Sequence, residues 1–289
     1  MNLRAFIKLS RIEHGVLTSL IVVASYIIAG GRSAIAMALL FLASLLTEIF
    51  LFATNDIFNV EEDRVNRPDA PIVSGEVSIR EAWALSLLSV VIAVLLNVLG
   101  IAMRYLMDWS IVILALAIFL GFFYNYGLKR VIIVNNVLVA ITSSLTFLYG
   151  LYAVSSIPPT LNLPYLLFIV SFLATMGREL VKGALDVAGD ARAGVKTMAN
   201  VYGIRTAVIM AVAFTLLAVA VSPLIIISSR GFPGIILSIG VVITDAMLLY
   251  ISIVVLTRPN YMSRFRTLAL GAMSITIIAY LLFALLLIL

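Results

Sequence analysis

The chain has 289 residues, of which 63% are hydrophobic and 11% are charged, and its mean hydropathy is +1.20. It contains no cysteine and one histidine, which excludes disulfides, sulfur-ligated metals and histidine-rich metal sites. Apolar runs of membrane-spanning length occur throughout. They exclude a soluble protein and predict an all-α polytopic membrane protein, with residues 1–289 as a single domain. The net charge of +5 arises from cations in short loops, which indicates membrane topology and no nucleic-acid partner.

Nine apolar segments are long enough to cross a membrane. The first runs from about Val16 to Ala29, and it follows the basic, amphipathic stretch MNLRAFIKLSRIEHG, which lacks the pattern of a cleaved signal peptide. The other eight occupy residues 33–55, 79–102, 109–128, 131–154, 163–182, 203–228, 233–256 and 265–289, with Gly, Pro or polar breaks between them. We therefore expect nine transmembrane helices.

The basic residues are distributed unequally between the two sides that nine spans define. Arg32, Arg104 and Arg230 fall on one side, and the remaining 16 of the 19 Lys and Arg residues fall on the side of the N-terminus. The positive-inside rule therefore predicts a cytoplasmic N-terminus in a cell membrane. The two charged stretches described next fall on the same, cytoplasmic side.

The first charged stretch follows the second predicted span and reads NDIFNVEEDRVNRPDAPIVSG, residues 55–75. Asn55, Asn59 and Asp63 recur at a spacing of four, so on a helix they form one oxygen-rich stripe. Asp56 lies beside the first of them. Such a stripe suits a hard cation, because hard cations prefer oxygen ligands.

The second charged stretch follows the sixth predicted span and reads RELVKGALDVAGDARAGVKT, residues 178–197. Arg178, Lys182, Asp186 and Asp190 repeat the four-residue step, which places two cations and two carboxylates along one helical face. We interpret the two stretches as halves of one site in a central cavity that opens to the cytoplasmic side. Their similar positions also leave an internal duplication open.

Two carboxylate-bearing segments that face one cavity can hold Mg²⁺ ions by one or two carboxylates each, while a diphosphate completes the coordination. Lysines and arginines nearby would bind the remaining phosphate charge. The residues that supply this combination are Asp56, Asp63, Asp186 and Asp190 with Lys129, Arg178 and Lys182. The alternative is that these residues are solvated loop charges at helix ends.

The first stretch resembles the NDxxDxxxD signature, and the second the DxxxD signature, of the UbiA superfamily of intramembrane prenyltransferases. The resemblance covers almost the whole chain, and both stretches look most like those of the archaeal digeranylgeranylglyceryl phosphate synthases. It implies transfer of a geranylgeranyl group from its diphosphate to the hydroxyl of geranylgeranylglyceryl phosphate, which forms an ether. Asn59 stands where the family pattern has its middle Asp, and Glu62 or Glu61 could supply the missing charge.

The resemblance also implies roles for individual residues. It implies that Mg²⁺ is held by Asp56, Asn59, Asp63, Asp186 and Asp190, and that Asp56, Asp63, Asp186, Asp190 and Lys129 are catalytic. For binding of the prenyl diphosphate donor and the lipid-like acceptor it implies Asn55, Asn59, Arg64, Arg67, Tyr124, Lys129, Arg130, Arg178 and Lys182. Because the donor carries a long hydrocarbon tail, we also expect the cavity to open sideways into the lipid bilayer.

The charge around the predicted site bears on the acceptor. The three loops there carry more cations than metal binding requires: Arg64, Arg67, Lys129, Arg130, Arg178, Lys182, Arg192 and Lys196. An acceptor with a phosphate needs more positive charge than an aromatic acid does. This excess therefore favours a glycerol phosphate lipid, and an aromatic acceptor such as 4-hydroxybenzoate is the alternative.

Several polar residues within or next to the spans are further candidates. Glu48 lies seven residues before Asn55 on the same helical face and could extend the site inward, and Asp245 lies in the eighth span. Ionisable residues inside a membrane are functional candidates because their isolation there is costly. The remaining candidates are Glu13 and His14 near the interface, and the rings of Tyr124, Tyr126, Tyr149 and Tyr152, which could stabilise an allylic cation or simply pack.

A secondary transporter is the alternative of another class. It would also have many spans and acids within the membrane, but it favours helices broken by Gly or Pro near the midplane. Here the acids cluster at the cytoplasmic ends of predicted helices. That location favours an enzyme that uses a diphosphate.

Overall fold

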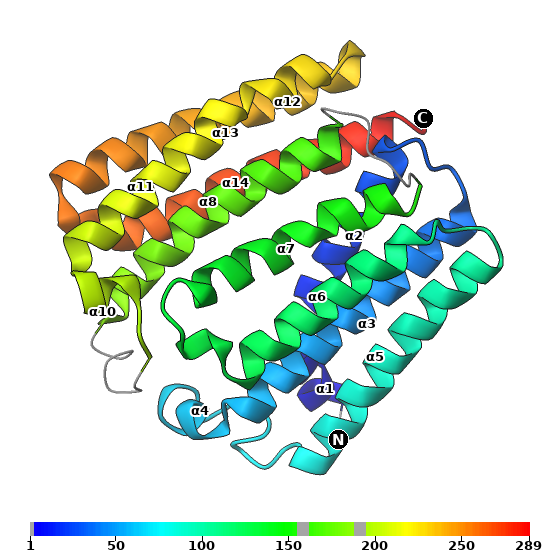
Figure 1. The fold of residues 1–289 in the computed structure, drawn as a ribbon, viewed down its shortest axis with the longest axis horizontal. Coiled ribbons are helices and arrows are strands. Elements are labelled where there is room, and N and C mark those ends of the chain that lie inside the picture. Colours follow the sequence, from blue (N-terminus) through cyan, green and yellow to red (C-terminus); the bar gives the residue numbers. More distant parts are fainter. Residues whose placement is uncertain (1–2, 155–161, 188–194) are drawn as a thin grey trace.

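The computed structural model describes residues 3–154, 162–187 and 195–289, and within these ranges every regular element is a helix (Figure 1). The α-helices are α1 (Leu3–Ser10), α2 (Ile12–Ile28), α3 (Ala34–Phe58), α4 (Val60–Asn66), α5 (Ile79–Ala102), α6 (Trp109–Tyr126), α7 (Val134–Tyr152), α8 (Leu163–Leu185), α10 (Met198–Tyr202), α11 (Ile204–Val221), α12 (Pro223–Ser228), α13 (Gly231–Thr257) and α14 (Met262–Leu286). Two 3₁₀ turns, η1 (Leu128–Arg130) and η2 (Pro259–Tyr261), connect neighbouring helices.

The predicted membrane-spanning architecture is confirmed. Within the described residues, eight helices are long and apolar enough to cross a bilayer, and the bent pair α1 and α2 makes up to nine. The chain is therefore a multi-pass membrane protein. The expected span over residues 203–228 consists of α11 followed by the short helix α12, with Pro223 in the first turn of α12. The two ends of the chain lie at opposite ends of the bundle (Figure 1), as an odd number of crossings requires.

The N-terminal helix α1 turns sharply into α2 at Arg11. The two helices meet at 51°, and Arg11 adopts the left-handed conformation with φ 43° and ψ 49°. Its guanidinium lies over the ring of Phe52 and 3.0 Å from the Asp56 carboxylate, both on α3. These contacts offset the strain of a left-handed residue that is not glycine, which costs of the order of 1–3 kcal/mol.

The interior of the bundle is built around α2, which packs against α3 and α7. Ser25 on α2 shares a 2.8 Å hydrogen bond with Tyr280 on α14, and the Tyr280 ring packs edge-on against Phe147 of α7. Large apolar side chains such as Leu88, Ile227 and Phe232 are exposed on the outside. In water so many exposed apolar residues would cause association, whereas in a bilayer they face the lipid.

Gly150 allows the closest approach between α7 and α2. A Cβ atom at this position would collide with the Val22 carbonyl oxygen and lie 2.6 Å from Ser25 Cβ. Backbone cannot move aside as the end of a flexible side chain can, so overpacking at this point has to separate the two helices.

We expect Gly150→Ala to lower the thermal stability of the purified protein in detergent, by about 1–3 kcal/mol or more. The matched control is Gly271→Ala on α14, where a Cβ atom meets no heavy atom within 4 Å. The control should unfold at the wild-type temperature or slightly above it, because alanine favours helix over glycine. Equal stability of the two variants would contradict the packing described for α7 and α2.

Candidate functional site

A polar cavity of about 250 Å³ lies where α3, α4, η1, α7 and α8 come together. Residues from both charged stretches line it, although more than a hundred positions separate them in the sequence. The lining residues are Asn55, Asn59, Glu62, Tyr124, Lys129, Asn135, Asn136, Val139, Glu179, Lys182, Gly183, Asp186, Val195 and Thr197. The backbone N–H of Lys196 also donates to the Arg130 carbonyl, 3.4 Å away, which joins the second stretch to η1.

Asn55 and Asn59 present a fixed pair of carboxamides to the cavity. The Asn59 amide donates to Asn55 Oδ1 at 3.2 Å, and the Asn55 amide donates to Asn125 Oδ1 at 2.9 Å. Asn125 in turn donates to Thr54 Oγ1 and to the Leu51 carbonyl, both at 2.9 Å. We did not predict a role for Asn125. A polar residue in the last turn of the otherwise apolar α6 was the available signal.

The expected stripe of Asn55, Asn59 and Asp63 is interrupted. Helix α3 ends at Phe58, Asn59 has φ −104° and ψ 8°, and α4 starts at Val60. Glu62 lines the cavity and Asp63 is absent from its lining. Glu62 lies seven residues after Asn55 and so shares its helical face, whereas a stripe at a spacing of four drifts off that face by Asp63. Asp63 therefore does not continue the expected stripe into the lining, while Glu62, the alternative source of charge that we named, does lie in the cavity.

Lys129 of η1 is the cation most closely held by the first stretch. Its ammonium lies 2.9 and 2.8 Å from the two Glu62 carboxylate oxygens and also donates to Asn59 Oδ1. The Lys129 side chain is only 12% exposed, so water screens this charge less than at an open surface. Arg130 reaches the same carboxylate at 3.4 Å but is mostly exposed.

Helix α8 contributes a second group of charges. Glu179 accepts from Arg178 at 2.5 Å and from Lys182 at 3.5 Å, and it lines the cavity together with Lys182 and Asp186. Arg178 Nε is buried without a hydrogen-bond partner among the described residues. We did not predict a role for Glu179, because the four-residue step led us to Arg178 and not to its neighbour. Asp190 and Arg192 lie outside the described residues.

Asp56 and Asp63 lie beside the cavity and do not form part of its lining. Asp56 Oδ1 accepts from Arg11 at 3.0 Å and from Arg67 at 3.4 Å, and Asp63 Oδ2 lies 3.7 Å from Arg67. Asp56 Oδ2 is buried with no hydrogen-bond partner among the described residues. Burial raises the pKa of the Asp63 carboxyl, and the guanidinium of Arg67 opposes this rise.

Other predicted residues are placed at varying distances from the cavity. Arg64 pairs with Glu61 at 3.1 Å on the exposed surface, away from the lining. Of the four tyrosines, Tyr124 lines the cavity, whereas Tyr126 and Tyr152 pack against other aromatic rings and Tyr149 is buried at a hydrogen bond to Asn97. His14 packs against the ring of Phe52.

The cavity offers only oxygen and nitrogen donors from side chains, and its three carboxylates belong to Glu62, Glu179 and Asp186. Within the described part of the chain, no group of three or more His, Cys, Asp or Glu residues is close enough to hold a metal ion by itself. The carboxylate and carboxamide oxygens of the lining fit Mg²⁺, which takes one or two carboxylates and completes its shell with phosphate oxygens and water.

Two curated relatives match most of the chain. A protein of Pyrococcus abyssi named digeranylgeranylglyceryl phosphate synthase is 31% identical over 290 residues, which cover 99% of both chains. A protein of Methanoculleus marisnigri with the same name is 31% identical over 256 residues, which cover 86% of both chains.

Solved structures share the fold. One, from a study of digeranylgeranylglyceryl phosphate synthase in membranes, superposes with a TM-score of 0.81 over 98% of both chains at 23% identity. A UbiA homologue from Archaeoglobus fulgidus, bound to GPP and Mg²⁺, has a TM-score of 0.68 at 16% identity and covers 96% of this chain and 99% of its own. The family model described as the UbiA prenyltransferase family matches residues 17–278, and the chain therefore belongs to that family.

Proposed function

We propose that this chain transfers a geranylgeranyl group from its diphosphate to the hydroxyl of geranylgeranylglyceryl phosphate, forming an ether. The observation that carries the proposal is the single polar cavity in which both charged stretches meet, lined by three carboxylates and two lysines among its described residues. The names of the relatives from Pyrococcus abyssi and Methanoculleus marisnigri support this choice of substrates.

The cavity suits the diphosphate of the donor. Lys129 and Lys182 project cationic groups into it, and Tyr124, Asn55 and Asn59 line the same space. A diphosphate oxygen would replace the Asn59 carbonyl as a partner of the Lys129 ammonium, because the phosphate oxygen is charged and the carbonyl is neutral. Charge that develops on the departing diphosphate would then be stabilised by cations already in place.

We further propose that the site works with a divalent cation such as Mg²⁺. When bound, the ion supplies positive charge that neutralises the leaving diphosphate. Glu62, Glu179 and Asp186 line the cavity, and one or two of these carboxylates, with phosphate oxygens and water, would be enough to hold it. Asp56, Asp63 and Asp190 remain predicted ligands from the family pattern, and the free Oδ2 of Asp56 supports its inclusion.

The site lies on the cytoplasmic side of a cell membrane in this proposal. Both charged stretches, the N-terminus and most of the basic residues share that side, which supports the orientation through the positive-inside rule. The donor and the acceptor both carry long hydrocarbon tails, so both would enter from the bilayer with their phosphates toward the cytoplasm.

We expect the purified protein in lipid nanodiscs, with Mg²⁺ and labelled geranylgeranyl diphosphate, to label geranylgeranylglyceryl phosphate much faster than 4-hydroxybenzoate when both are present. Chelation of Mg²⁺ by EDTA should abolish the transfer, and added Mg²⁺ should restore it. Faster labelling of the aromatic acid would overturn the acceptor assignment. Uptake of a solute into liposomes without Mg²⁺ and without product formation would instead indicate a transporter.

Lys129→Ala should weaken binding of geranylgeranyl diphosphate on the order of 10- to 100-fold, because it removes one charge-assisted hydrogen bond worth about 1.5–3 kcal/mol. Lys129→Arg keeps the charge and should lose less. The matched control is Arg80→Ala, which removes an exposed cation from the same membrane side but outside the cavity lining. Titration of a fluorescent donor analogue measures all three variants. Equal affinity of Lys129→Ala and wild type would remove Lys129 from the donor site.

A further inference from the structure

Glu48 is an acidic residue that the site described above does not use. It lies in the middle of α3, a helix that crosses the membrane. No cation lies within salt-bridge distance of it among the described residues, and Thr18 of α2 is its hydrogen-bonding neighbour. Insertion of an isolated carboxylate at the centre of a membrane helix costs roughly 2.5–3.5 kcal/mol. Such a cost indicates a function for the group.

The side chain of Glu48 faces a small pocket of about 40 Å³ between α2, α3, α6 and α7. Hydroxyl groups gather there on three of these helices, including those of Thr18, Ser44, Thr142 and Thr146. Ser44 Oγ is buried and has no hydrogen-bond partner among the described residues. The pocket thus holds a carboxylate without a cationic partner and a hydroxyl without a hydrogen-bond partner among the described residues, although it lies within the apolar part of the bundle.

This pocket lies directly beneath the polar cavity. On α3, Leu51 lines the pocket and Asn55 lines the cavity, and on α7, Thr142 lines the pocket and Val139 lines the cavity. Residues three or four positions apart share a helix face and differ in height by about one turn, 5.4 Å. On both helices, the residue that lines the pocket therefore lies about one turn below the residue that lines the cavity.

We propose that this pocket receives the nucleophilic hydroxyl of the lipid acceptor and that Glu48 takes its proton. The inference rests on the proposed function. In a glycerol phosphate the middle hydroxyl is on the carbon next to the one that bears the phosphate. On α3, Glu48 lies seven residues, about two turns, below Asn55. With the phosphate held at the deep end of the cavity, near Asn55, this hydroxyl reaches about one turn deeper, to the level of Leu51, which lines the same pocket as Glu48.

The chemistry is balanced within the site. The acceptor oxygen forms a bond to the first carbon of the prenyl chain, and the bond between that carbon and the diphosphate oxygen breaks. Its electron pair leaves with the diphosphate. The hydroxyl proton passes to the Glu48 carboxylate, since a general base must lie within hydrogen-bond reach of the proton that it removes.

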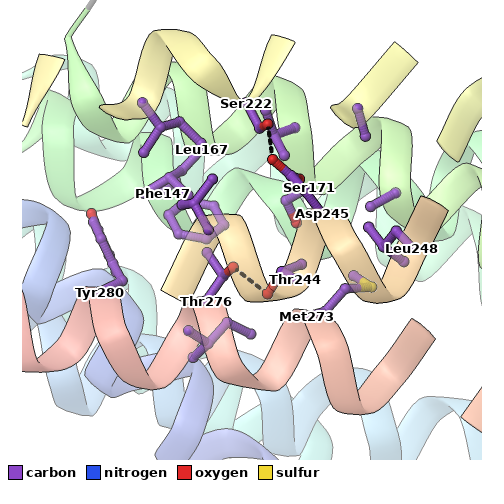
Figure 2. Close-up of a pocket in the computed structure, with 16 residues that line it drawn as sticks. Phe147, Leu167, Ser171, Ser222, Thr244, Asp245, Leu248, Met273, Thr276 and Tyr280 are labelled. Atoms are coloured by element: carbon purple, nitrogen blue, oxygen red, sulfur yellow. Dashed lines mark hydrogen bonds between the residues drawn. The ribbon is translucent and has the colours of Figure 1, made fainter. Parts of the chain in front are cut away.

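A second acid in the membrane provides a comparison. Asp245 on α13 lines a different pocket between α8, α11, α13 and α14, and Figure 2 shows its carboxylate directed at the Ser222 hydroxyl, 2.5 Å away. Helix α13 contributes no residue to the lining of the polar cavity. Asp245 is therefore a matched control: the same chemical group in the same membrane, but away from the reaction.

The test compares wild type, Glu48→Gln and Asp245→Asn in nanodiscs with Mg²⁺, geranylgeranyl diphosphate and geranylgeranylglyceryl phosphate. Glu48→Gln should lower kcat by about 10²- to 10⁴-fold, the range for loss of a general base, with donor affinity within twofold of wild type. Asp245→Asn should retain wild-type kcat. A kcat of Glu48→Gln within threefold of wild type overturns the inference, and so does an equal loss of donor binding and activity, which indicates a structural role.

A second measurement uses the unmodified chain and so does not depend on folding of a variant. An apolar carbodiimide should modify Glu48 in the wild-type protein, as detected by mass spectrometry of peptides. Geranylgeranylglyceryl phosphate should slow modification of Glu48 but not of Asp245. Unchanged modification of Glu48 overturns the inference. If the wild-type protein transfers no geranylgeranyl group to the glyceryl acceptor, the proposed function itself is overturned. This result differs from unchanged modification of Glu48, so failure of the inference and failure of the proposed function can be told apart.

Discussion

The contact of Lys129 with Glu62 is the interaction on which the polar cavity depends. It joins η1, at the end of α6, to α4, at the end of α3, and it brings Asn59 to the same ammonium group. The pair is mostly shielded from water, so removal of either partner would leave a poorly solvated charge. Helix α8 adds Glu179 and Lys182 to the wall, so the cavity holds charges of both signs that a diphosphate and its metal can rearrange.

Helix α3 connects the charged end of the bundle with its apolar interior. One face of α3 carries Ser44, Glu48 and Leu51, which line the hydroxyl-lined pocket, and then Asn55, which lines the cavity. Arg11 holds the outer side of the same helix end through Asp56 and Phe52. One helix thus positions the groups for a charged leaving group and those for a neutral nucleophile at successive levels.

The membrane architecture and the meeting of the two charged stretches were predictable from the sequence, because long apolar runs and the scarcity of charge leave few other arrangements. The local geometry was not. Glu62 lines the cavity and Asp63 does not, because a stripe at a spacing of four drifts off the face that Asn55 presents, whereas a spacing of seven stays on it. The break at Asn59 was not indicated by spacing or helix propensity. Asn125 escaped notice because its role depends on a contact between helices, with Asn55. Glu179 pairs with Arg178 and Lys182 of its own helix, and only the packing of α8 beside the first charged stretch places it in the cavity. The role of Asp190 remains a prediction from the family pattern.

We propose that the two charged stretches form one donor site, and a double-mutant cycle tests this most directly. Binding of geranylgeranyl diphosphate with Mg²⁺ would be measured by calorimetry for wild type, Glu62→Gln, Asp186→Asn and the double variant. Groups in one site show coupling energies of about 0.5–3 kcal/mol, while independent sites add to within about 0.3–0.5 kcal/mol. We predict that the double variant loses an amount of binding free energy that differs clearly from the sum of the losses of the two single variants. Simple additivity of the two losses would contradict it.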